Sequence, residues 1–314
     1  MPTQLPRHCH PRGRSRRLLR LTLLAGFALF ATPALAPAEA QALSPLVSPP
    51  TPDHHVGKPI FVQLVTPDLD TAKRFYGDLF GWSFRPAQAG ATDAVMAYAD
   101  DQPIAGLIHR EFPAGTQRQP AWLTFLSVRD VDATNTLAVQ GGARVLILPH
   151  NIPGFGREAI YADPQGAVFA TLASASGDPQ DVLAAPGQWI WSSLLTTNPD
   201  TDAAFYQSLF DYEVFDLPDD AGGPHFMLAS DEYARASANR LPPGPEKRHP
   251  HWLNYIRVVD TDATVAKLTA LGGHVLVPPR PDRHGGRIAV AADPSGAPFG
   301  LMEWTDADSK EVLK

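Results

Sequence analysis

The chain has 314 residues, a single cysteine (Cys9) and a formal net charge of −7 at neutral pH. Residues 1–40 hold six arginines and one glutamate, so residues 41–314 have 20 basic and 32 acidic side chains and a net charge of −12. This composition argues against nucleic acid or an anionic membrane as a partner, because both bind basic faces, and it excludes a disulfide or thiolate metal site after residue 40.

Residues 1–40 have the pattern of a secretory signal peptide. Six arginines precede an apolar run at residues 21–35, and Ala38-Glu39-Ala40 fits the small-x-small cleavage pattern before Gln41. Ser15-Arg16-Arg17-Leu18-Leu19 resembles a twin-arginine signal without its usual Phe, so this route and the general secretory route both stay open. We expect export to the periplasm or the medium, with no membrane span after processing. An uncleaved anchor helix is the alternative.

Two stretches without periodicity divide the remaining chain. Residues 41–57 are rich in Pro, Ser and Thr and predict a flexible tether, and residues 175–186 predict a linker. The boundaries give a first domain at 58–174, a second domain at 187–305 and a frayed tail at 306–314. His54 and His55 fall in the tether and are expected to be unstructured.

Strands and helices alternate within the first domain. The helix opened by Pro67-Asp68 has apolar residues at helical spacing and ends at Gly81. A second helix covers residues 131–140 and ends at Gly141-Gly142. Strands are predicted at 60–65, 94–99, 103–109, 122–128, 145–148, 158–162 and 168–172.

The second domain repeats the first about 130 positions later. Asp163-Pro164-Gln165-Gly166-Ala167 returns as Asp293-Pro294-Ser295-Gly296-Ala297, and Trp122-Leu123 returns as Trp252-Leu253. Phe75-Tyr76 also returns as Phe205-Tyr206. Shared spacing over half a chain indicates a duplicated domain and not a short solenoid unit.

These motifs resemble the vicinal oxygen chelate superfamily, which includes glyoxalase I, extradiol dioxygenases and bleomycin resistance proteins. The resemblance extends from Pro59 to Trp304 and is strongest to the tandem glyoxalase-like subgroup. It implies an α+β fold of two tandem glyoxalase-like domains, each made of two βαβββ modules with a curved mixed sheet enclosing a cavity. Fold analogy alone does not supply the function.

The resemblance also implies where metal ligands would lie in metal-using members. The positions are Phe61, Leu123 and Ala173 in the first domain, and Trp191, Leu253 and Glu303 in the second. Only Glu303 is a donor, and a divalent ion needs three or four converging donors. We therefore expect no metal and no other cofactor, with a His251–Glu303 pair as the weaker alternative and Glu303 as the one weak catalytic candidate.

Strand alternation predicts which side chains line the two cavities. The predicted ligand-binding residues are Phe61, Gln63 and Phe125 in the first domain and Trp191, Ser193, Tyr255, Arg257 and Glu303 in the second. The greater polarity of the second set favours the second domain as the functional site. An Arg257–Glu303 pair that merely closes the sheet is the structural alternative. Arg157 and Arg287, in matching loops, could meet an anionic ligand or pair with surface carboxylates.

Three functions remain open on this basis. The first is an exported protein that binds a small aromatic or planar molecule without a metal. The second is a divalent-metal lyase, isomerase or dioxygenase that uses the second domain. The third is a protein-interaction module with vestigial pockets. Under any of the three, the protein could be a monomer or a homodimer.

Overall fold

The computed structural model describes residues 43–88, 92–113, 119–217, 225–241, 249–282 and 285–304. The predicted signal peptide and the predicted tail lie outside these ranges. No helix in the described ranges is long and apolar enough to cross a bilayer.

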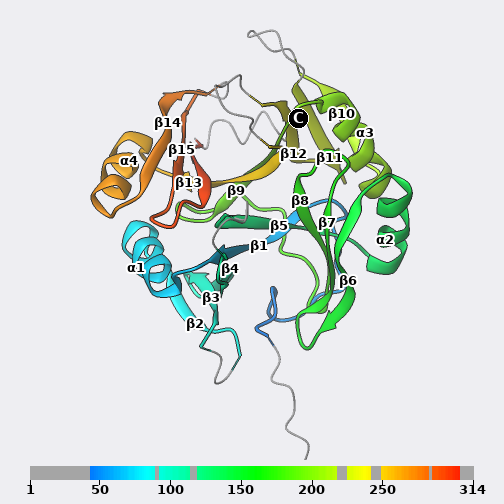
Figure 1. Ribbon diagram of the computed structural model, residues 1–314, viewed down its shortest axis with the longest axis horizontal. Coiled ribbons are helices and arrows are strands. Elements are labelled where there is room, and N and C mark those ends of the chain that lie inside the picture. The colour runs from blue at the N-terminus through cyan, green and yellow to red at the C-terminus, as the bar shows by residue number, and fades with distance from the viewer. Residues whose placement is uncertain are drawn as a thin grey trace, which may run out of the picture. The chain divides into compact units, whose positions relative to one another are not determined.

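Each predicted domain forms one eight-stranded mixed sheet with two helices, which confirms the α+β class (Figure 1). Domain 1 consists of β1 (Pro59–Thr66), α1 (Leu69–Phe80), β2 (Ser83–Pro86), β3 (Ala94–Ala99), β4 (Gln102–His109), β5 (Ala121–Ser127), α2 (Val131–Gln140), β6 (Arg144–Ile152), β7 (Gly156–Ala162) and β8 (Val168–Ser174). Domain 2 consists of β9 (Trp189–Thr196), α3 (Pro199–Phe210), β10 (Glu213–Asp216), β11 (His225–Ser230), β12 (Tyr233–Arg240), β13 (His251–Val258), α4 (Thr261–Ala270), β14 (His274–Pro281), β15 (Arg287–Ala292) and β16 (Pro298–Glu303).

The strand order is the same in both sheets. It runs β2-β3-β4-β1-β5-β8-β7-β6 in domain 1 and β10-β11-β12-β9-β13-β16-β15-β14 in domain 2. The first strands of the two modules pair antiparallel at the centre, β1 with β5 and β9 with β13. The helices of each domain cover one face of its sheet, which we call the helix face. We call the opposite face of the sheet the inner face.

Local sequence signals set the helix ends. Asp68 accepts a hydrogen bond from the Thr71 amide at 2.9 Å and begins α1, while Gly81 ends it at φ +78°, a conformation that favours glycine. The apolar side chains at positions i, i+3, i+4 and i+7 of α1 are all buried: Ala72, Phe75, Tyr76 and Leu79. In domain 1, strand β2 is the element that sequence periodicity did not locate, since only four residues form it.

The helix faces of the two sheets pack against each other, so each apolar core contains residues from both domains. One core joins Phe75 and Tyr76 of α1 to Ile256, Leu268 and Phe299 of domain 2. The other joins Phe169 of domain 1 to Phe205 and Tyr206 of α3. Helix α1 accordingly lies beside α4, and α2 beside α3 (Figure 1). The two domains are thus distinct sheets that share their hydrophobic cores.

Matching hydrogen bonds cross the domain boundary at both cores. Tyr76 donates to Asp293 at 3.2 Å and receives a bond from the Trp122 indole at 3.0 Å. Tyr206 donates to Asp163 at 3.1 Å and receives one from Trp252 at 2.9 Å. The repeated sequence motifs of the two halves therefore form two equivalent interfaces.

The segment before β1 packs against domain 1, which corrects the expectation of a flexible tether. We call residues 43–58 the N-terminal strap. Leu46 is buried among residues of the domain 1 inner face, and the amides of Thr51 and His55 donate to Ser176 and Asp178. His55 and its neighbour His54 lie within 4 Å of carboxylates, so they are structured as well. A Pro-rich segment of low periodicity can still bury one well-placed leucine, and periodicity does not detect this.

Candidate functional site

The inner face of domain 2 carries the richest set of polar side chains among the predicted site residues. Strand β9 contributes Trp191, Ser193 and Leu195, and β13 contributes Leu253 and Tyr255. Apolar side chains of β15 and β16 surround them: Ile288, Val290 and Met302, with Trp304 directly after β16. The result is an aromatic and aliphatic surface with hydroxyl groups near its centre.

Ser237 of β12 is the centre of a hydrogen-bond network on this face. Its Oγ accepts from the Trp191 indole and from the Asn239 amide, both at 3.1 Å, and lies 2.8 Å from Ser193 Oγ. A hydroxyl oxygen has two lone pairs, so these two donors occupy its acceptor capacity and its own proton goes to Ser193. The Ser193 hydroxyl is then left to donate to a further group.

The phenol of Tyr255 lies near this hydroxyl on the same face. Burial raises the pKa of Tyr255 to about 12, and the charge of Arg280 and the nearby Ser193 hydroxyl lower it in part. The phenol therefore remains protonated at neutral pH and can act as a hydrogen-bond donor but not as a base. Arg280 and Asp282, at the end of β14, are the charged side chains whose fields reach this phenol, with opposite effects on its pKa.

Tyr255 takes its position because residue 300 is a glycine. Tyr255 pairs with Gly300 on β16, and a Cβ added to Gly300 would lie 2.1 Å from Cδ1 of the ring. The ring thus covers the glycine directly. In domain 1 the equivalent pair is Phe125 and Ala170, which leaves an apolar contact at the same place.

The inner face of domain 1 has no hydroxyl at the positions where domain 2 has Ser193, Ser237 and Tyr255. Gln63 pairs with Gly106 in the register in which Ser193 pairs with Ser237. Phe61 packs edge-on against Phe125 at 5.4 Å and against Phe155 at 5.1 Å. Of the predicted domain 1 residues, only Gln63 brings a polar group to this face.

Two predicted residues of domain 2 do not belong to the inner-face network. Arg257 donates to the carbonyl oxygens of Ala184 and Trp304, both at 2.8 Å, and so ties the linker to the end of the sheet. Glu303 accepts from the Thr261 amide at 2.7 Å, at the N-terminus of α4. Leu301 and Phe299, two and four residues earlier, lie in the core on the helix face.

The prediction that Glu303 points into the cavity is therefore wrong. The same alternation of side chains along β8 places Ala173 on the helix face, whereas Ala170 and Leu172 lie on the inner face. An error of one residue in the assumed strand register moves every side chain to the opposite face. The carboxylate of Glu303 instead satisfies an unpaired amide at the start of a helix.

The matching loop arginines pair with surface carboxylates, which was the structural alternative. Arg157 lies 2.7 Å from Asp132, and Arg287 lies 2.9 Å from Asp262. Each carboxylate belongs to the first turn of the helix in the same module. These arginines are therefore bound to the protein's own surface carboxylates.

Sequence reasoning missed Ser237 and Asn239, which complete the network with Ser193. The segment Tyr233–Arg240 alternates between polar and small apolar residues, with Ala236 and Ala238 fully buried on the helix side. This alternation is the signal that could have located the strand and its polar face. Within the described part of the chain, the buried Oδ1 of Asn239 has no hydrogen-bond partner.

Comparison with known proteins agrees with this architecture. Residues 54–171 match the model of the Glyoxalase/Bleomycin resistance protein/Dioxygenase superfamily, and residues 192–302 match that of the Glyoxalase-like domain. The protein named "Putative glyoxylase CFP32" of Mycobacterium tuberculosis is 32% identical over 257 residues, covering 81% of this chain and 98% of its own. The chain belongs to this superfamily. Another relative, "Anthracycline biosynthesis protein DnrV" of Streptomyces peucetius, is 27% identical over 270 residues, which cover 79% of this chain and 93% of its own.

Solved structures of the superfamily share the fold. The Mn(II)-bound glyoxalase from Novosphingobium aromaticivorans has a TM-score of 0.58 at 17% identity, covering 80% of this chain and 83% of its own. A homoprotocatechuate 2,3-dioxygenase variant from B. fuscum has a TM-score of 0.57 at 13% identity, covering 82% and 74%. At these identities the similarity concerns the fold alone.

The superfamily's divalent metal does not fit the residues of this chain. The first-strand positions hold Phe61, Leu123, Trp191 and Leu253, none of which is a donor. Within the described ranges, no three His, Cys, Asp or Glu residues group as a metal site would require. The His251–Glu303 pair is not possible either. His251 begins β13, and Glu303 pairs with Val258 at its end, seven residues or about 23 Å away.

Proposed function

We propose that this protein binds a small planar molecule with hydrogen-bonding oxygens on the inner face of domain 2, without a metal ion. The observation that carries the proposal is the hydrogen-bond network of Trp191, Ser237 and Ser193, with the protonated phenol of Tyr255 beside it. It sits on an otherwise aromatic and aliphatic surface, which is the usual composition of a small-molecule site. The matching face of domain 1 lacks these hydroxyls.

The network suits a planar ligand in two ways. The indole of Trp191 is only partly buried and is held in place by Ser237, so it offers a fixed aromatic surface for stacking. The protonated phenol of Tyr255 donates to a ligand oxygen, and Asn239 Oδ1 supplies an acceptor for a ligand hydroxyl. A ligand without these oxygens leaves buried polar groups unpaired, which disfavours its binding.

The names of two relatives are consistent with this chemistry. DauV of Streptomyces sp. and DnrV of Streptomyces peucetius are both named anthracycline biosynthesis proteins. Anthracyclines are planar and aromatic and carry several oxygens. We therefore favour polycyclic quinones and phenols as the first compounds to test.

Binding to a water-soluble anthraquinone, followed by quenching of tryptophan fluorescence, tests the proposal. Tyr255→Phe removes the donor and should weaken binding by about tenfold, the effect of one hydrogen bond to a buried group. Tyr233→Phe removes the hydroxyl of an exposed tyrosine in the same domain and should leave the affinity as in the wild type. Equal affinity in all three proteins would rule out the inner face of domain 2 as the site for this compound.

We also propose that the protein acts outside the cytoplasm. The support is the arginine-rich start, the apolar run and Ala38-Glu39-Ala40 in the sequence. N-terminal sequencing of protein from the cell envelope should give Gln41 as the first residue. An intact Met1 in that fraction would refute the cleavage.

A further inference from the structure

The N-terminal strap occupies the inner face of domain 1. Leu46 is 4% exposed and belongs to the same buried cluster as Phe61, Met96 and Phe125. Leu43 and Val47 pack against this cluster as well. In this domain, therefore, a segment of the chain itself covers the face on which domain 2 carries its polar network.

The head of the strap, residues 43–47, makes polar contacts of the kind that a bound peptide makes. The Leu43 amide donates to the Pro153 carbonyl at 3.1 Å, and the Val47 amide donates to Ser176 Oγ at 3.1 Å. Tyr98 donates from its phenol to Ser44 Oγ at 2.8 Å. Two backbone amides and one side chain are thus recognised together with the buried leucine.

The rest of the strap is fastened separately from its head. Thr51 donates to the Ser176 carbonyl at 2.9 Å and crosses Gly177, where an added Cβ would lie 2.4 Å from the Thr51 oxygen. Farther along, the His55 amide donates to Asp178 Oδ2 at 2.7 Å, and Asp178 also accepts from Ser127. Residues 48–50, between these contacts and the head, are exposed.

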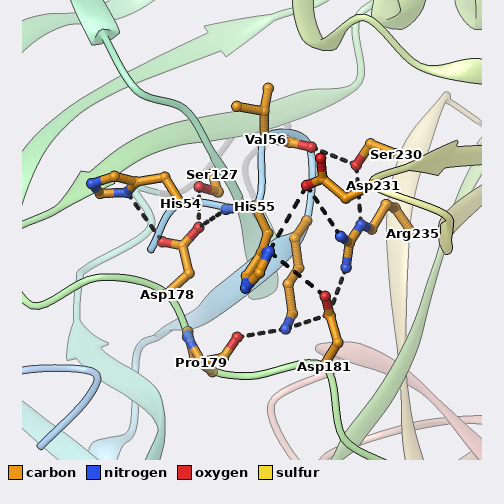
Figure 2. A network of polar contacts seen from close by, with 11 residues as sticks. His54, His55, Val56, Ser127, Asp178, Pro179, Asp181, Ser230, Asp231 and Arg235 are labelled. Carbon is orange, nitrogen blue, oxygen red and sulfur yellow. Dashed lines mark hydrogen bonds and ion pairs between the residues drawn. The ribbon is translucent and has the colours of Figure 1, made fainter. Parts of the chain in front are cut away.

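Figure 2 shows how this anchor extends into domain 2. The Val56 carbonyl accepts from Ser230, and Arg235 binds Asp181 of the linker. Lys58, where the strap meets β1, lies 2.7 Å from the same Asp181. The anchor at residues 51–58 therefore has contacts of its own in addition to Ser176, which it shares with the head at residues 43–47.

We propose that the inner face of domain 1 is a peptide-binding site and that the chain's own residues 43–47 are its resident ligand. The site recognises an extended apolar peptide with leucines three positions apart, through Leu46 in the aromatic cluster and the amides at residues 43 and 47. While the head is seated, this face is closed to other molecules. The site is separate from the domain 2 face, so its test is independent of the proposed function.

The tethered head competes with any free peptide for this site. A short tether holds a ligand at an effective concentration in the millimolar range. A free peptide of residues 43–52 should therefore bind the unaltered chain at least about tenfold more weakly than a chain whose head is weakened. The difference between these affinities is the signature of a resident ligand.

The full processed chain with Leu46→Asp provides the test, because a buried aspartate disfavours the seated head. A fluorescently labelled peptide of residues 43–52 should bind this variant saturably in an anisotropy titration. Val182→Asp alters an exposed apolar residue of the linker and should behave as the unaltered chain does. The same peptide with Leu46→Asp should not bind any of the proteins. Absence of peptide binding to a folded Leu46→Asp variant, or equal binding to all three proteins, would overturn the proposal.

Hydrogen exchange in the unaltered chain provides a second measurement if Leu46→Asp does not fold. The amides of Leu43 and Val47 should exchange at least about tenfold more slowly than in the isolated peptide. Millimolar free peptide should then accelerate their exchange by displacing the head. Unprotected amides, or protection that free peptide does not change, would contradict a displaceable resident ligand.

Discussion

The inner faces of the two domains share a backbone frame and differ in a few side chains. Gln63 and Gly106 in domain 1 match Ser193 and Ser237 in domain 2, and the register of the paired strands is the same. Phe125 over Ala170 likewise matches Tyr255 over Gly300. One face is apolar and covered by a leucine of the strap, and the other carries a hydroxyl network. The Trp191 indole and the Asn239 amide of the network also have apolar counterparts, Phe61 and Ile108. The comparison teaches that a handful of substitutions give one frame two kinds of surface.

The two domain interfaces show the same principle on the helix faces. Tyr76–Asp293 and Tyr206–Asp163 are matching hydrogen bonds, and burial raises the pKa of both aspartates. The interfaces differ at one buried helix position, where α1 has Ala72 and α3 has Asp202. Among the described residues, only the interface at Tyr206 therefore contains a second buried carboxylate, so a substitution of Asp202 affects one interface and not the other.

Asp202→Ala tests this difference and should have the largest effect. Burial, with the charge of Asp163 adding to it, raises the pKa of Asp202 to about 6 from its ordinary value of 3.8. A raised pKa in the folded state means that its stabilising contribution is complete below pH 4 and is lost as the pH rises through about 6. Removing the carboxyl should increase the free energy of unfolding at pH 8 by up to about 3 kcal/mol and have little effect at pH 4.

Denaturant unfolding of both proteins across this pH range gives the measurement. Asp200→Ala removes an exposed carboxylate from the same helical turn, and its stability should follow the pH dependence of the wild type. A constant difference between Asp202→Ala and wild type at all pH values would show that Asp202 is not the titrating group.

Gly300→Ala tests the position of Tyr255. The added Cβ would lie 2.1 Å from the ring, so the ring has to move, and overpacking of this kind costs about 1–3 kcal/mol. We expect lower stability in denaturant unfolding together with weaker binding of the anthraquinone. The reverse change in domain 1, Ala170→Gly, should cost about 0.5–1 kcal/mol and leave ligand binding unaltered. Unaltered ligand affinity in Gly300→Ala would mean that the ring of Tyr255 does not contribute to the site.

Glu303→Ala distinguishes a helix-capping carboxylate from a ligand-binding one. The loss of the bond to the Thr261 amide should cost about 1 kcal/mol of stability, as for other helix N-terminal contacts. Ligand affinity should not change, because the carboxylate lies on the helix face. Glu213→Ala, an exposed glutamate of β10, is the control for loss of charge alone. A selective loss of ligand binding in Glu303→Ala would restore the sequence-based assignment.

Removal of divalent metal ions with a chelator should have no effect on the protein. A metal that binds the folded state at saturating concentration stabilises it by several kcal/mol. We expect a chelator to change neither the melting temperature nor anthraquinone binding, since the inner-face positions of both domains lack the required donors. A large fall in melting temperature that added divalent metal reverses would reveal a metal site.

The sequence predicted the fold well because its signals are local and repeated. Asp68 begins a helix as expected, and Asp130 and Asp260 do so at the matching positions of other modules; each side chain accepts a bond from an amide of the first turn. The turn at Asp163 is set in the same local way, with its Oδ1 accepting bonds from three amides at 2.8–2.9 Å.

The site could be predicted only in part, because it depends on pairing between distant strands. Trp191, Ser193 and Tyr255 follow from alternation within their own strands. Ser237 becomes recognisable only when β12 is known to lie beside β9. The facing of Glu303 depends on the register of the last strand, and the seating of Leu46 depends on a cluster formed by several strands. Amino-acid composition does not reveal which strands lie side by side or in which register they pair.

The shared cores have a consequence for how this chain folds. Tyr76 and Asp293 are 217 positions apart, and Thr124 bonds Asn254 across 130 positions at the centre of the molecule. Contacts of such long range require large loops to close, so they form slowly and late. The core around α1 cannot be completed until nearly the whole chain has been synthesised, because it includes Phe299 and Leu301. Until then the first half exposes the aromatic face of α1, and a nascent chain in this state is open to aggregation.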